Sequence, residues 1–551
     1  MKLISIASLW PTLVLIVPVL ATAADAPEAA VREIVVTRRY LHLPVTTGAP
    51  VRRITLRNAG RSVRQFDICL ATDKPDFVVF VDIGRWRGKR LMIDAGKLVG
   101  GAKALASIVQ SDAIPGQSHL YRERHRPQFH FTSRRGWLND PNGLVYYQGE
   151  WHLFYQHNPY GWKWGNMHWG HAVSRDLVHW TELGDAIHPW SDCKGAAFSG
   201  SAVVDWKNTS GFQSGQEHVL VAIYTDTGAG ESIAYSNDRG RTWTMFPNNP
   251  VVKHSGRDPK VIWHRPTNRW VMAVYDQVDD KRYIAFYSSH NLKEWTFESR
   301  IEGFFECPDL FELPVDGDEA NSRWVLHAAD GQYVLGDFDG HAFHPDHDGK
   351  HQTWYGNYYA GQSYFAAPDG RRVQIGWGRG VTFPNMPFNQ QMTIPVNLTL
   401  RATADGIRMF AEPVDEIHAL VDHTSAQADV ALGKEPHTID VAGELLDITA
   451  TFAIADSTAV GLSVHGVEIV YDVAKKAIDC GTIAPLEPID GRITLRVLAD
   501  RGSIEVFGNH GRVAISHGIL ADKDQTGVAL FARGGTARLS KLVAHTLKSA
   551  W

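Results

Sequence analysis

Three carboxylate residues in the middle of the chain lie in short turn-like motifs. Asp140 lies in WLNDPNG at 137–143, Asp258 in RDP at 257–259, and Glu306 in EC at 306–307. Proline at the second turn position and a closing glycine favour β-turns, and a rigid turn presents its first side chain in a fixed direction. Carboxylates that meet in one site can serve as nucleophile, acid or base. Taken singly, each motif is typical of a structural turn; together they favour a catalytic site.

The residues that precede Glu306 and Asp258 indicate how the negative charges of these side chains are stabilised. Glu306 follows the apolar stretch Gly303, Phe304 and Phe305, and Asp258 follows Arg257. Because carboxylates are rarely buried without a partner, we expect Glu306 either to be paired or to have a raised pKa.

The elements that must position these residues are predicted to be strands. Three motifs, SRDLVHW from 174, SNDRGRTW from 236 and SHNLKEW from 289, begin 62 and 53 residues apart, each after β-like residues. A strand repeat of this length is typical of propeller blades, and residues 126–415 have room for five of about 58 residues. Helical periodicity is nearly absent, which argues against a TIM barrel. The copy at 236–243 also fits the Asp box of sialidases, which is a structural hairpin.

Segments with a different composition and residue pattern flank this region. Residues 27–120 contain β-like runs at 33–37 and 76–81 and a helix-like run at 102–109, and they predict a small β-rich accessory domain. Residues 424–549 alternate as strands do, for example at 502–507, and a short helical candidate precedes them at 413–420. The predicted fold is all-β: a five-bladed propeller at 126–415 followed by a β-sandwich at 424–549.

Composition sets broad limits. The 551 residues are 44% hydrophobic and 21% charged, as expected of a globular protein, and the net charge of -5 gives no reason to expect nucleic acid as a partner. Residues 1–24 read as a signal peptide, with a basic start, an apolar core and an A-x-A exit, so we expect a secreted or periplasmic protein with no membrane segment after cleavage. The oligomeric state stays open.

Cysteine and histidine usage does not favour a metal. The four cysteines form no C-x-x-C pair; we expect mostly free, buried thiols, although three disulfide pairings are arithmetically open. HPDHD at 344–348 with His351, and His168 with His171, contain ligand-type residues but are typical of a polar loop and of strand residues. We expect no metal and no cofactor.

In combination, the motifs resemble glycoside hydrolase family 32, the invertase, inulinase and levanase family. Further matching stretches are YQHNP at 155–159, WGNMHWGH at 164–171, FSGS at 198–201 and GWG at 376–378, and the resemblance runs from about residue 126 to the C-terminus. The resemblance implies Asp140 as nucleophile, Glu306 as general acid/base and Asp258 as transition-state stabiliser. Residues 27–120 resemble an accessory module of some bacterial members, whose role is unclear.

The resemblance also implies a sugar pocket. The residues that would hold a terminal fructosyl unit are Asn139, Gln156, Trp164, Ser199 and Trp377. Trp137 and Phe198 would form apolar walls, and Arg257 would pair with a carboxylate of the site.

The implied function is that of a secreted retaining β-fructofuranosidase acting on the ends of levan or inulin and on sucrose. A fructosyltransferase with the same intermediate is an open alternative, as are a catalytically silent fructan-binding protein and an inverting arabinan-type hydrolase. Intact Asp140 and Glu306 disfavour the silent protein, and WLNDPNG disfavours the inverting hydrolase. Linkage preference and strict exo action stay open.

Overall fold

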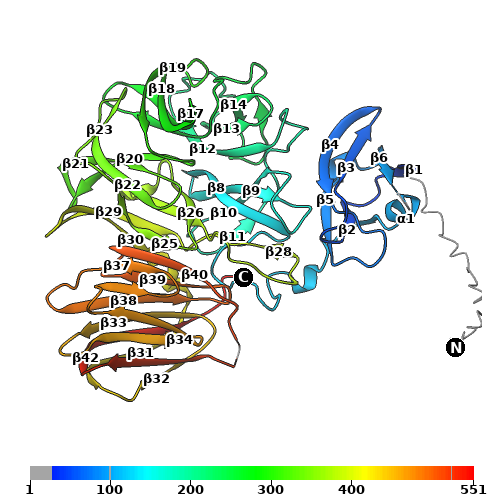
Figure 1. Cartoon of the computed structure of the whole chain (residues 1–551). Coiled ribbons are helices and arrows are strands. Elements are labelled where there is room, and N and C mark those ends of the chain that lie inside the picture. The colour runs from blue at the N-terminus through cyan, green and yellow to red at the C-terminus, as the bar shows by residue number, and fades with distance from the viewer. Residues whose placement is uncertain (1–27, 99–100, 523) are drawn as a thin grey trace, which may run out of the picture.

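Three β-rich units follow one another along the chain (Figure 1). The computed structural model describes residues 28–98, 101–522 and 524–551, so the proposed signal peptide at 1–24 lies outside the described residues. In these ranges no helix is long and apolar enough to cross a membrane. The all-β prediction, with a propeller, a sandwich and an N-terminal β-rich region, is confirmed.

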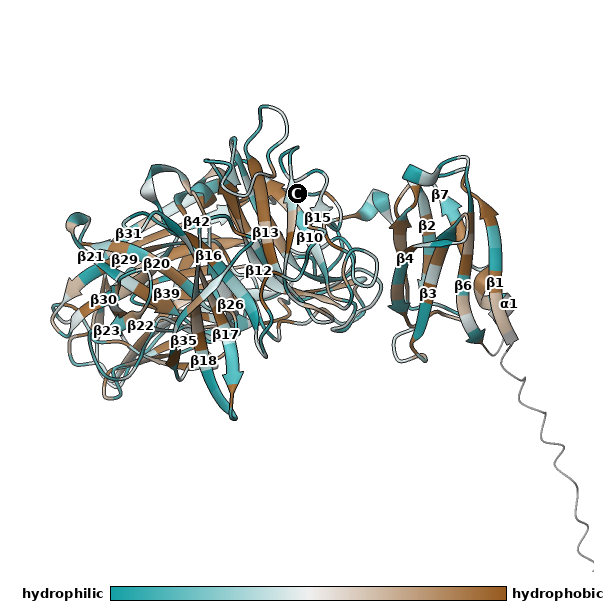
Figure 2. Cartoon of the chain, turned by 90° about the horizontal axis from the view of Figure 1, so that it is seen from above, coloured by the Kyte–Doolittle hydropathy of each residue, from teal (hydrophilic) through white to brown (hydrophobic). Residues whose placement is uncertain are grey.

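The first unit, which we call the N-terminal module (residues 28–112), packs two antiparallel sheets face to face. One sheet has the order β1 (Glu28–Val35), β6 (Arg90–Leu98), β3 (Arg52–Asn58) and β4 (Arg61–Ile68), and the other the order β5 (Phe77–Asp82), β2 (Tyr40–Val45) and β7 (Val109–Ser111). Buried and exposed residues alternate along β4, because neighbouring side chains of a strand point to opposite faces. Figure 2 shows this alternation of hydrophobic and hydrophilic residues. The helix-like run is α1 (Gly101–Ala106), and η1 (Gly84–Trp86) and η2 (Gln117–His119) are single 3-10 turns.

The propeller has five antiparallel blades. Its strands are β8 (Gly136–Tyr147), β9 (Glu150–Asn158), β10 (His168–Ser174) and β11 (Trp180–Glu182) in blade I; β12 (Ala197–Asp205), β13 (Val219–Asp226), β14 (Gly230–Ser236) and β15 (Thr244–Met245) in blade II; β16 (Arg257–His264), β17 (Arg269–Val278), β18 (Lys281–Ser289) and β19 (Thr296–Glu302) in blade III; β20 (Asp309–Val315), β21 (Asp318–His327), β22 (Gln332–Phe338), β23 (Phe343–Pro345) and the short β24 (His351–Gln352) in blade IV; and β26 (Tyr359–Ser363), β27 (Val373–Trp377), β29 (Val396–Thr403) and β30 (Gly406–Pro413) in blade V. The 3-10 turn η3 (Pro368–Gly370) lies in blade V.

The three repeated motifs are the hairpin turns that lead to the last strands of blades I, II and III. In each turn the tryptophan indole N–H donates to a backbone carbonyl of the turn: Trp180 to Leu177 at 3.0 Å, Trp243 to Gly240 at 3.1 Å and Trp295 to Leu292 at 2.7 Å. The repeat therefore marks one structural device used three times.

The first strand of each blade lines the central axis, and neighbouring first strands pack on one another around the ring. The short strand β28 (Phe388–Asn389), which comes from blade V, pairs in parallel with Gly136 and Trp137 at the start of β8. This pairing adds a late segment of the chain to blade I and closes the ring.

The last unit is a sandwich of two sheets. The larger sheet has the order β25 (Trp354–Gly356), β40 (Val513–Gly518), β39 (Ser503–Gly508), β38 (Arg492–Ala499), β33 (Leu446–Ala453), β42 (Ala537–Leu547) and β31 (Val421–Leu432); the smaller has β32 (His437–Ala442), β41 (Gly527–Arg533), β34 (Ala459–Val464), β35 (Val467–Asp472), β36 (Ala477–Asp479) and β37 (Ile483–Pro485). Because β25 precedes blade V in the chain, its pairing with β40 joins the two units. The expected helical segment is the 3-10 helix η4 (Asp415–Leu420).

A buried carboxylate also joins the sandwich to the propeller. Asp500 accepts hydrogen bonds from the backbone N–H groups of Gln128, Phe129 and His130 at 2.8, 3.1 and 3.2 Å. The His130 ring nitrogen Nδ1 lies 2.9 Å from the same carboxylate, and both side chains are fully buried. This cluster anchors the segment that leads into the propeller.

Candidate active site

A cavity of about 550 Å³ lies at the end of the propeller where the first strands begin, so the side chains at those starts converge on it. Its lining comprises Asn139, Asp140, Gln156, Trp164, Phe198, Ser199, Arg257, Asp258, Arg282, Phe305, Glu306, Asp330, Tyr359, Trp377 and Arg379. Ten of the eleven residues that the sequence singled out are in this set, and Trp137 is not.

The backbone is strained where two of the carboxylates are presented. Asp258, Glu306 and Cys307 have positive φ angles of 68°, 50° and 41°, a region that residues other than glycine seldom adopt. The Asp258 N–H donates to the Thr225 hydroxyl at 2.9 Å, and the Cys307 N–H donates to Oδ2 of Asp258 at 3.2 Å. Such strain persists only where neighbouring contacts fix it, and it is concentrated at functional sites.

Asp140 sits among hydrogen-bond donors on the wall of the cavity. The Ser199 hydroxyl donates to its Oδ2 at 2.9 Å, and the Cys307 sulfur lies 3.7 Å from the same oxygen. Burial raises the pKa of Asp140, whereas hydrogen bonds from Ser199 and Asn139 act in the opposite direction. These donors favour the ionised carboxylate that a nucleophile requires.

Trp137 supports this arrangement through contacts with two lining residues, Asn139 and Trp377. Its indole N–H donates to Oδ1 of Asn139 at 2.9 Å, which fixes the amide that bonds to Asp140. Its ring lies edge-on to Trp377, with 6.1 Å between the ring centroids. Trp137 therefore orients two lining residues, although it is not among the residues that line the cavity.

Asp258 is the most enclosed of the three carboxylates, with a side chain only 4% exposed. Burial, followed by the negative charge of Asp140, raises its pKa to about 8. Near neutral pH the Asp258 carboxyl therefore carries a proton, which removes one of two adjacent negative charges.

Glu306 is held at both oxygens. The Arg257 guanidinium bonds to Oε1, with Nε at 3.1 Å and a terminal nitrogen closer still, and the Tyr359 hydroxyl donates to Oε2 at 2.6 Å. Burial raises the pKa of Tyr359, so this hydroxyl keeps its proton. The Glu306 side chain is 22% exposed, which leaves it accessible from the cavity mouth.

The aromatic residues beside Glu306 divide between two environments. Phe305 lines the cavity, and its ring lies 5.4 Å from the Arg257 guanidinium carbon. Phe304 is 2% exposed and packs in the apolar core between blades III and IV. Only one of the two phenylalanines therefore borders the site.

The sequence analysis missed four polar lining residues: Arg282, Asp330, Tyr359 and Arg379. Tyr359 begins β26 and belongs to no recognised motif, whereas Arg379 directly follows the GWG stretch. The Arg379 guanidinium lies over the Tyr359 ring at 4.5 Å. Of these four residues, only Arg379 had a signal in the sequence, namely its position directly after GWG.

The mouth of the cavity carries an exposed tryptophan. Trp164 is 58% exposed, and its ring lies edge-on to Phe198 with 6.0 Å between the centroids. Aromatic faces above a floor of carboxylate, amide and hydroxyl groups suit a neutral ligand with many hydroxyl groups.

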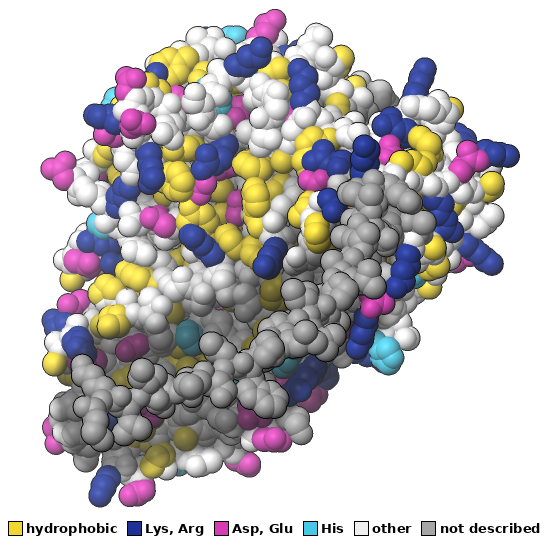
Figure 3. Space-filling model, turned by 45° about the vertical axis from the view of Figure 1, so that its right-hand side comes forward, with side chains coloured by type: hydrophobic (Ala, Val, Ile, Leu, Met, Phe, Trp, Pro, Cys, Tyr) yellow, Lys and Arg dark blue, Asp and Glu magenta, His cyan; other side chains and the backbone are white. Residues whose placement is uncertain are grey.

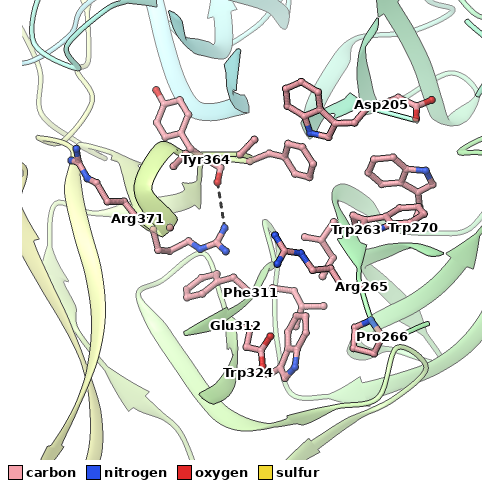
Figure 4. Close-up of a pocket in the computed structure, with 18 of the residues that line it drawn as sticks. Asp205, Trp263, Arg265, Pro266, Trp270, Phe311, Glu312, Trp324, Tyr364 and Arg371 are labelled. Carbon is pink, nitrogen blue, oxygen red and sulfur yellow. Dashed lines mark hydrogen bonds between the residues drawn. The ribbon is translucent and has the colours of Figure 1, made fainter. Parts of the chain in front are cut away.

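A second cavity, of about 500 Å³, lies among the later residues of the same first strands (Figure 4). Trp263, Trp270 and Trp324 line it, and the Arg372 guanidinium donates to the backbone carbonyl of Tyr364 at 3.3 Å. None of the three motif carboxylates borders it, so it is not the candidate catalytic site.

The cysteines and histidines are engaged elsewhere. All four cysteines are free thiols, of which Cys307 and Cys480 are buried and Cys69 and Cys193 are half-buried. His171 lies against His152, with 3.0 Å between ring nitrogens. Within the described ranges, no group of three or more His, Cys, Asp or Glu side chains is placed to hold a metal ion.

Comparison with known families agrees with this geometry. Residues 130–413 match the family described as "Glycosyl hydrolases family 32 N-terminal domain", and residues 416–546 match "Glycosyl hydrolases family 32 C terminal". The chain belongs to glycoside hydrolase family 32. Both matched segments exclude the N-terminal module.

Relatives of this family 32 chain include fructan-degrading enzymes. It is 39% identical over 498 residues to a levanase of Bacillus subtilis (strain 168), covering 80% of this chain and 73% of the levanase. It is 31% identical over 529 residues to an extracellular exo-inulinase of Aspergillus niger, covering 80% of this chain and 98% of the relative.

Solved family 32 structures share the fold. The exo-inulinase from Aspergillus awamori matches with a TM-score of 0.71 at 29% identity, covering 78% of this chain and 100% of that one. A fructofuranosidase from Schwanniomyces occidentalis, solved in complex with fructose, matches with a TM-score of 0.69 at 28% identity over 78% and 99% of the two chains. The family 32 chain is thus a glycoside hydrolase of the β-fructofuranosidase type, an exo-fructosidase of the levanase, inulinase and invertase group.

Proposed function

We propose that this enzyme is a secreted or periplasmic β-fructofuranosidase that removes terminal fructosyl units from levan or inulin, and also cleaves sucrose, with retention of configuration. The observation that carries the proposal is the presence of three carboxylates in one cavity with different surroundings. Asp140 faces hydroxyl, thiol and amide donors, Asp258 is enclosed and protonated, and Glu306 is held by Arg257 and Tyr359 within reach of the mouth.

In the first step, Asp140 attacks the anomeric carbon of the terminal fructosyl unit and forms a covalent ester. Glu306 takes up a proton before this step and gives it to the leaving glycosidic oxygen, a role that suits the carboxylate nearer to the mouth. Asp258 bonds to ring hydroxyls most strongly as positive charge develops on the ring. Asn139, Gln156, Ser199 and Trp377 position the sugar.

In the second step, water attacks the ester from the face that the leaving group vacated. Glu306, now ionised, removes a proton from this water, and Asp140 is released. Two inversions at the anomeric carbon give net retention.

Two other features support the proposed substrate and location. The Schwanniomyces relative was solved with fructose, and an Aspergillus relative is named extracellular. The signal-like sequence at 1–24 agrees with export. A fructosyltransferase would pass through the same ester, but no observation favours a sugar acceptor over water.

Early-time NMR of sucrose hydrolysis tests the mechanism. The first product should be β-fructofuranose, before mutarotation sets in. An α-anomer as first product would remove Asp140 from the nucleophile role. Chromatography of products from levan, inulin and sucrose, run side by side, would establish the substrate range, and oligosaccharides longer than the input acceptor would indicate transfer.

A further inference from the structure

The N-terminal module is basic, unlike the chain that carries it. Residues 28–112 hold 15 Lys and Arg against 8 Asp and Glu, whereas the whole chain has a net charge of -5. Figure 3 shows Lys and Arg side chains crowded on the right-hand side of the molecule, the side that bears the module in Figure 1. An excess of one charge on a single unit indicates a partner of the opposite charge.

The module is docked on blade I through specific contacts. The ring of Tyr160, which follows β9, stacks on Phe66 of the module core with 4.0 Å between the centroids. Nearby, the Asp67 N–H donates to Oδ1 of Asn166 at 2.6 Å, and the Gln65 N–H donates to the Ser191 hydroxyl at 3.1 Å.

A cavity of about 630 Å³ lies between the module and the propeller, within the usual size of small-molecule sites. Six arginines line it: Arg39, Arg64 and Arg85 from the module, and Arg134, Arg135 and Arg241 from the propeller. Four of them have carboxylate partners, at 2.9 Å for Arg39–Asp82, 3.2 Å for Arg134–Glu182, 3.2 Å for Arg135–Glu123 and 2.8 Å for Arg241–Glu150.

Arg64 and Arg85 lack such a partner. Among the described residues, no hydrogen bond or ion pair joins either guanidinium group to an acceptor. Arg64 is only 8% exposed, and its Nε is buried with no hydrogen-bond partner. Burying a guanidinium group without a counter-charge is costly, so an anion that enters the cavity gains a strong electrostatic and hydrogen-bonding partner.

The two unpaired arginines are close enough to influence each other. Burial, followed by the positive charge of Arg64, lowers the pKa of Arg85, while the negative charge of Asp192 acts in the opposite direction. Asp192 is itself bonded to His188, with 2.7 Å between Oδ2 and Nδ1. Its charge partly offsets that of the two arginines, but within the described part of the chain it forms no ion pair with either guanidinium group.

We propose that this cavity binds a small organic oxyanion, a ligand up to the size of a monosaccharide that carries a phosphate or carboxylate group. Arg64 and Arg85 form the anion-binding fork, because guanidinium groups match phosphate and carboxylate oxygens in pairs. The module supplies this fork, and blades I and II supply the opposite wall. The bound ligand consequently strengthens the docking of the module on the propeller.

Isothermal titration of the full chain tests this site with four probes: inorganic phosphate, fructose 6-phosphate, galacturonate and neutral fructose. At least one of the three anionic probes should bind in saturable fashion at low salt. The anion that binds most tightly identifies phosphate or carboxylate as the recognised group. Arg64→Gln should weaken binding by at least about tenfold, and Arg85→Gln should also weaken it. Arg61→Gln is the matched control, since Arg61 is exposed on the same strand outside the cavity.

Thermal unfolding provides an independent readout. The preferred anion should raise the Tm of the wild type and of Arg61→Gln but not that of Arg64→Gln, because only a ligand bound to the folded state stabilises it. Sucrose hydrolysis by the Arg64 and Arg85 variants should match the wild type.

Three results would overturn the proposal. These are the absence of saturable binding by every anion, binding that Arg64→Gln and Arg85→Gln leave unchanged, and equal binding of neutral fructose through the same cavity. Anion binding among Arg257, Arg282 and Arg379 of the active site would inhibit hydrolysis and would be insensitive to Arg64→Gln, which separates it from the proposed site.

Discussion

Cys307 contacts Asp258 through two groups: its backbone N–H donates to Oδ2 at 3.2 Å, and its sulfur lies 3.5 Å from the same oxygen. The sulfur also lies 3.7 Å from Oδ2 of Asp140. Burial raises the pKa of the thiol, so it stays protonated and can donate. Cys307 thus lies between the proposed nucleophile and the proposed transition-state stabiliser.

Cys307→Ala should lower kcat by about tenfold, because the weak S–H donor between two carboxylates is lost. Steady-state kinetics on sucrose, with circular dichroism as a check on folding, measures the effect. Cys480→Ala provides the control, since Cys480 is also a buried free thiol but lies in the sandwich. An unchanged kcat in Cys307→Ala would assign the residue a packing role only.

Asp140→Asn and Glu306→Gln should each lower kcat by several orders of magnitude without loss of folding. With Glu306→Gln the loss should shrink on substrates whose leaving group needs no proton, whereas with Asp140→Asn it should not. Parallel kinetics on sucrose and on an activated aryl fructoside separates the two. Equal losses of Glu306→Gln on both substrates would remove Glu306 from the acid role.

Asp258→Asn should stabilise the protein at alkaline pH while abolishing most activity. The pKa of Asp258 is raised from the usual 3.8 to about 8. Between these two pH values the folded state binds more protons than the unfolded state, so the stability of the wild type falls as the pH rises through this range. The neutral amide of the variant does not titrate, so the variant does not lose stability in this way. The difference in the free energy of unfolding between variant and wild type should therefore grow from pH 4 to pH 8, to on the order of a few kcal/mol at the upper end, and chemical unfolding at each pH measures it. A constant difference would mean that Asp258 is ionised throughout.

Asp500→Ala should destabilise the junction of propeller and sandwich by about 3–5 kcal/mol, because it leaves buried N–H groups and the His130 ring without their acceptor. Chemical unfolding at pH 6 measures this. Asp422→Ala is the control: Asp422 pairs with Lys548 at the surface of the sandwich, so its loss should cost less than about 1 kcal/mol.

The same cluster should contribute to pH dependence. Asp500 and Glu505 raise the pKa of His130 from 6.5 to about 9, against the opposing effect of burial. A raised histidine pKa gives stability that is fully present below pH 6.5 and is lost as pH rises through 9. His130→Gln should therefore lose more stability relative to wild type at pH 6 than at pH 9.5, as measured by chemical unfolding at each pH. Equal losses would mean that His130 is neutral in the folded protein.

Local sequence was sufficient to predict the strand repeats, in which three tryptophans mark equivalent hairpins. The β-turns expected at Asp140 and Asp258 were wrong: both residues lie inside strands, β8 and β16, where irregular pairing marks a bulge. The hairpins depend on a few neighbouring residues, which explains why they could be read without the structure.

Residues whose role depends on the ring of blades could not be found in this way. Tyr359 reaches Glu306 only because blade V closes beside blade IV, and no motif surrounds it. Phe304 stands next to lining residues in sequence, yet its side chain packs in the apolar core between blades III and IV, and Trp137 contacts the lining residues Asn139 and Trp377 without lining the cavity itself. Adjacency along a strand does not determine which face a side chain occupies until the sheet has packed.

The pairing of β28 with β8 has a consequence for biosynthesis. Blade I contains some of the first propeller residues to leave the ribosome, but the strand that pairs with the start of β8 ends only at Asn389. During synthesis of the intervening blades this edge stays open, and an open edge is a template for pairing with other chains. Nascent chains are therefore most prone to aggregate before Asn389 emerges, so conditions that slow initiation or supply a holding chaperone should raise the yield of folded enzyme.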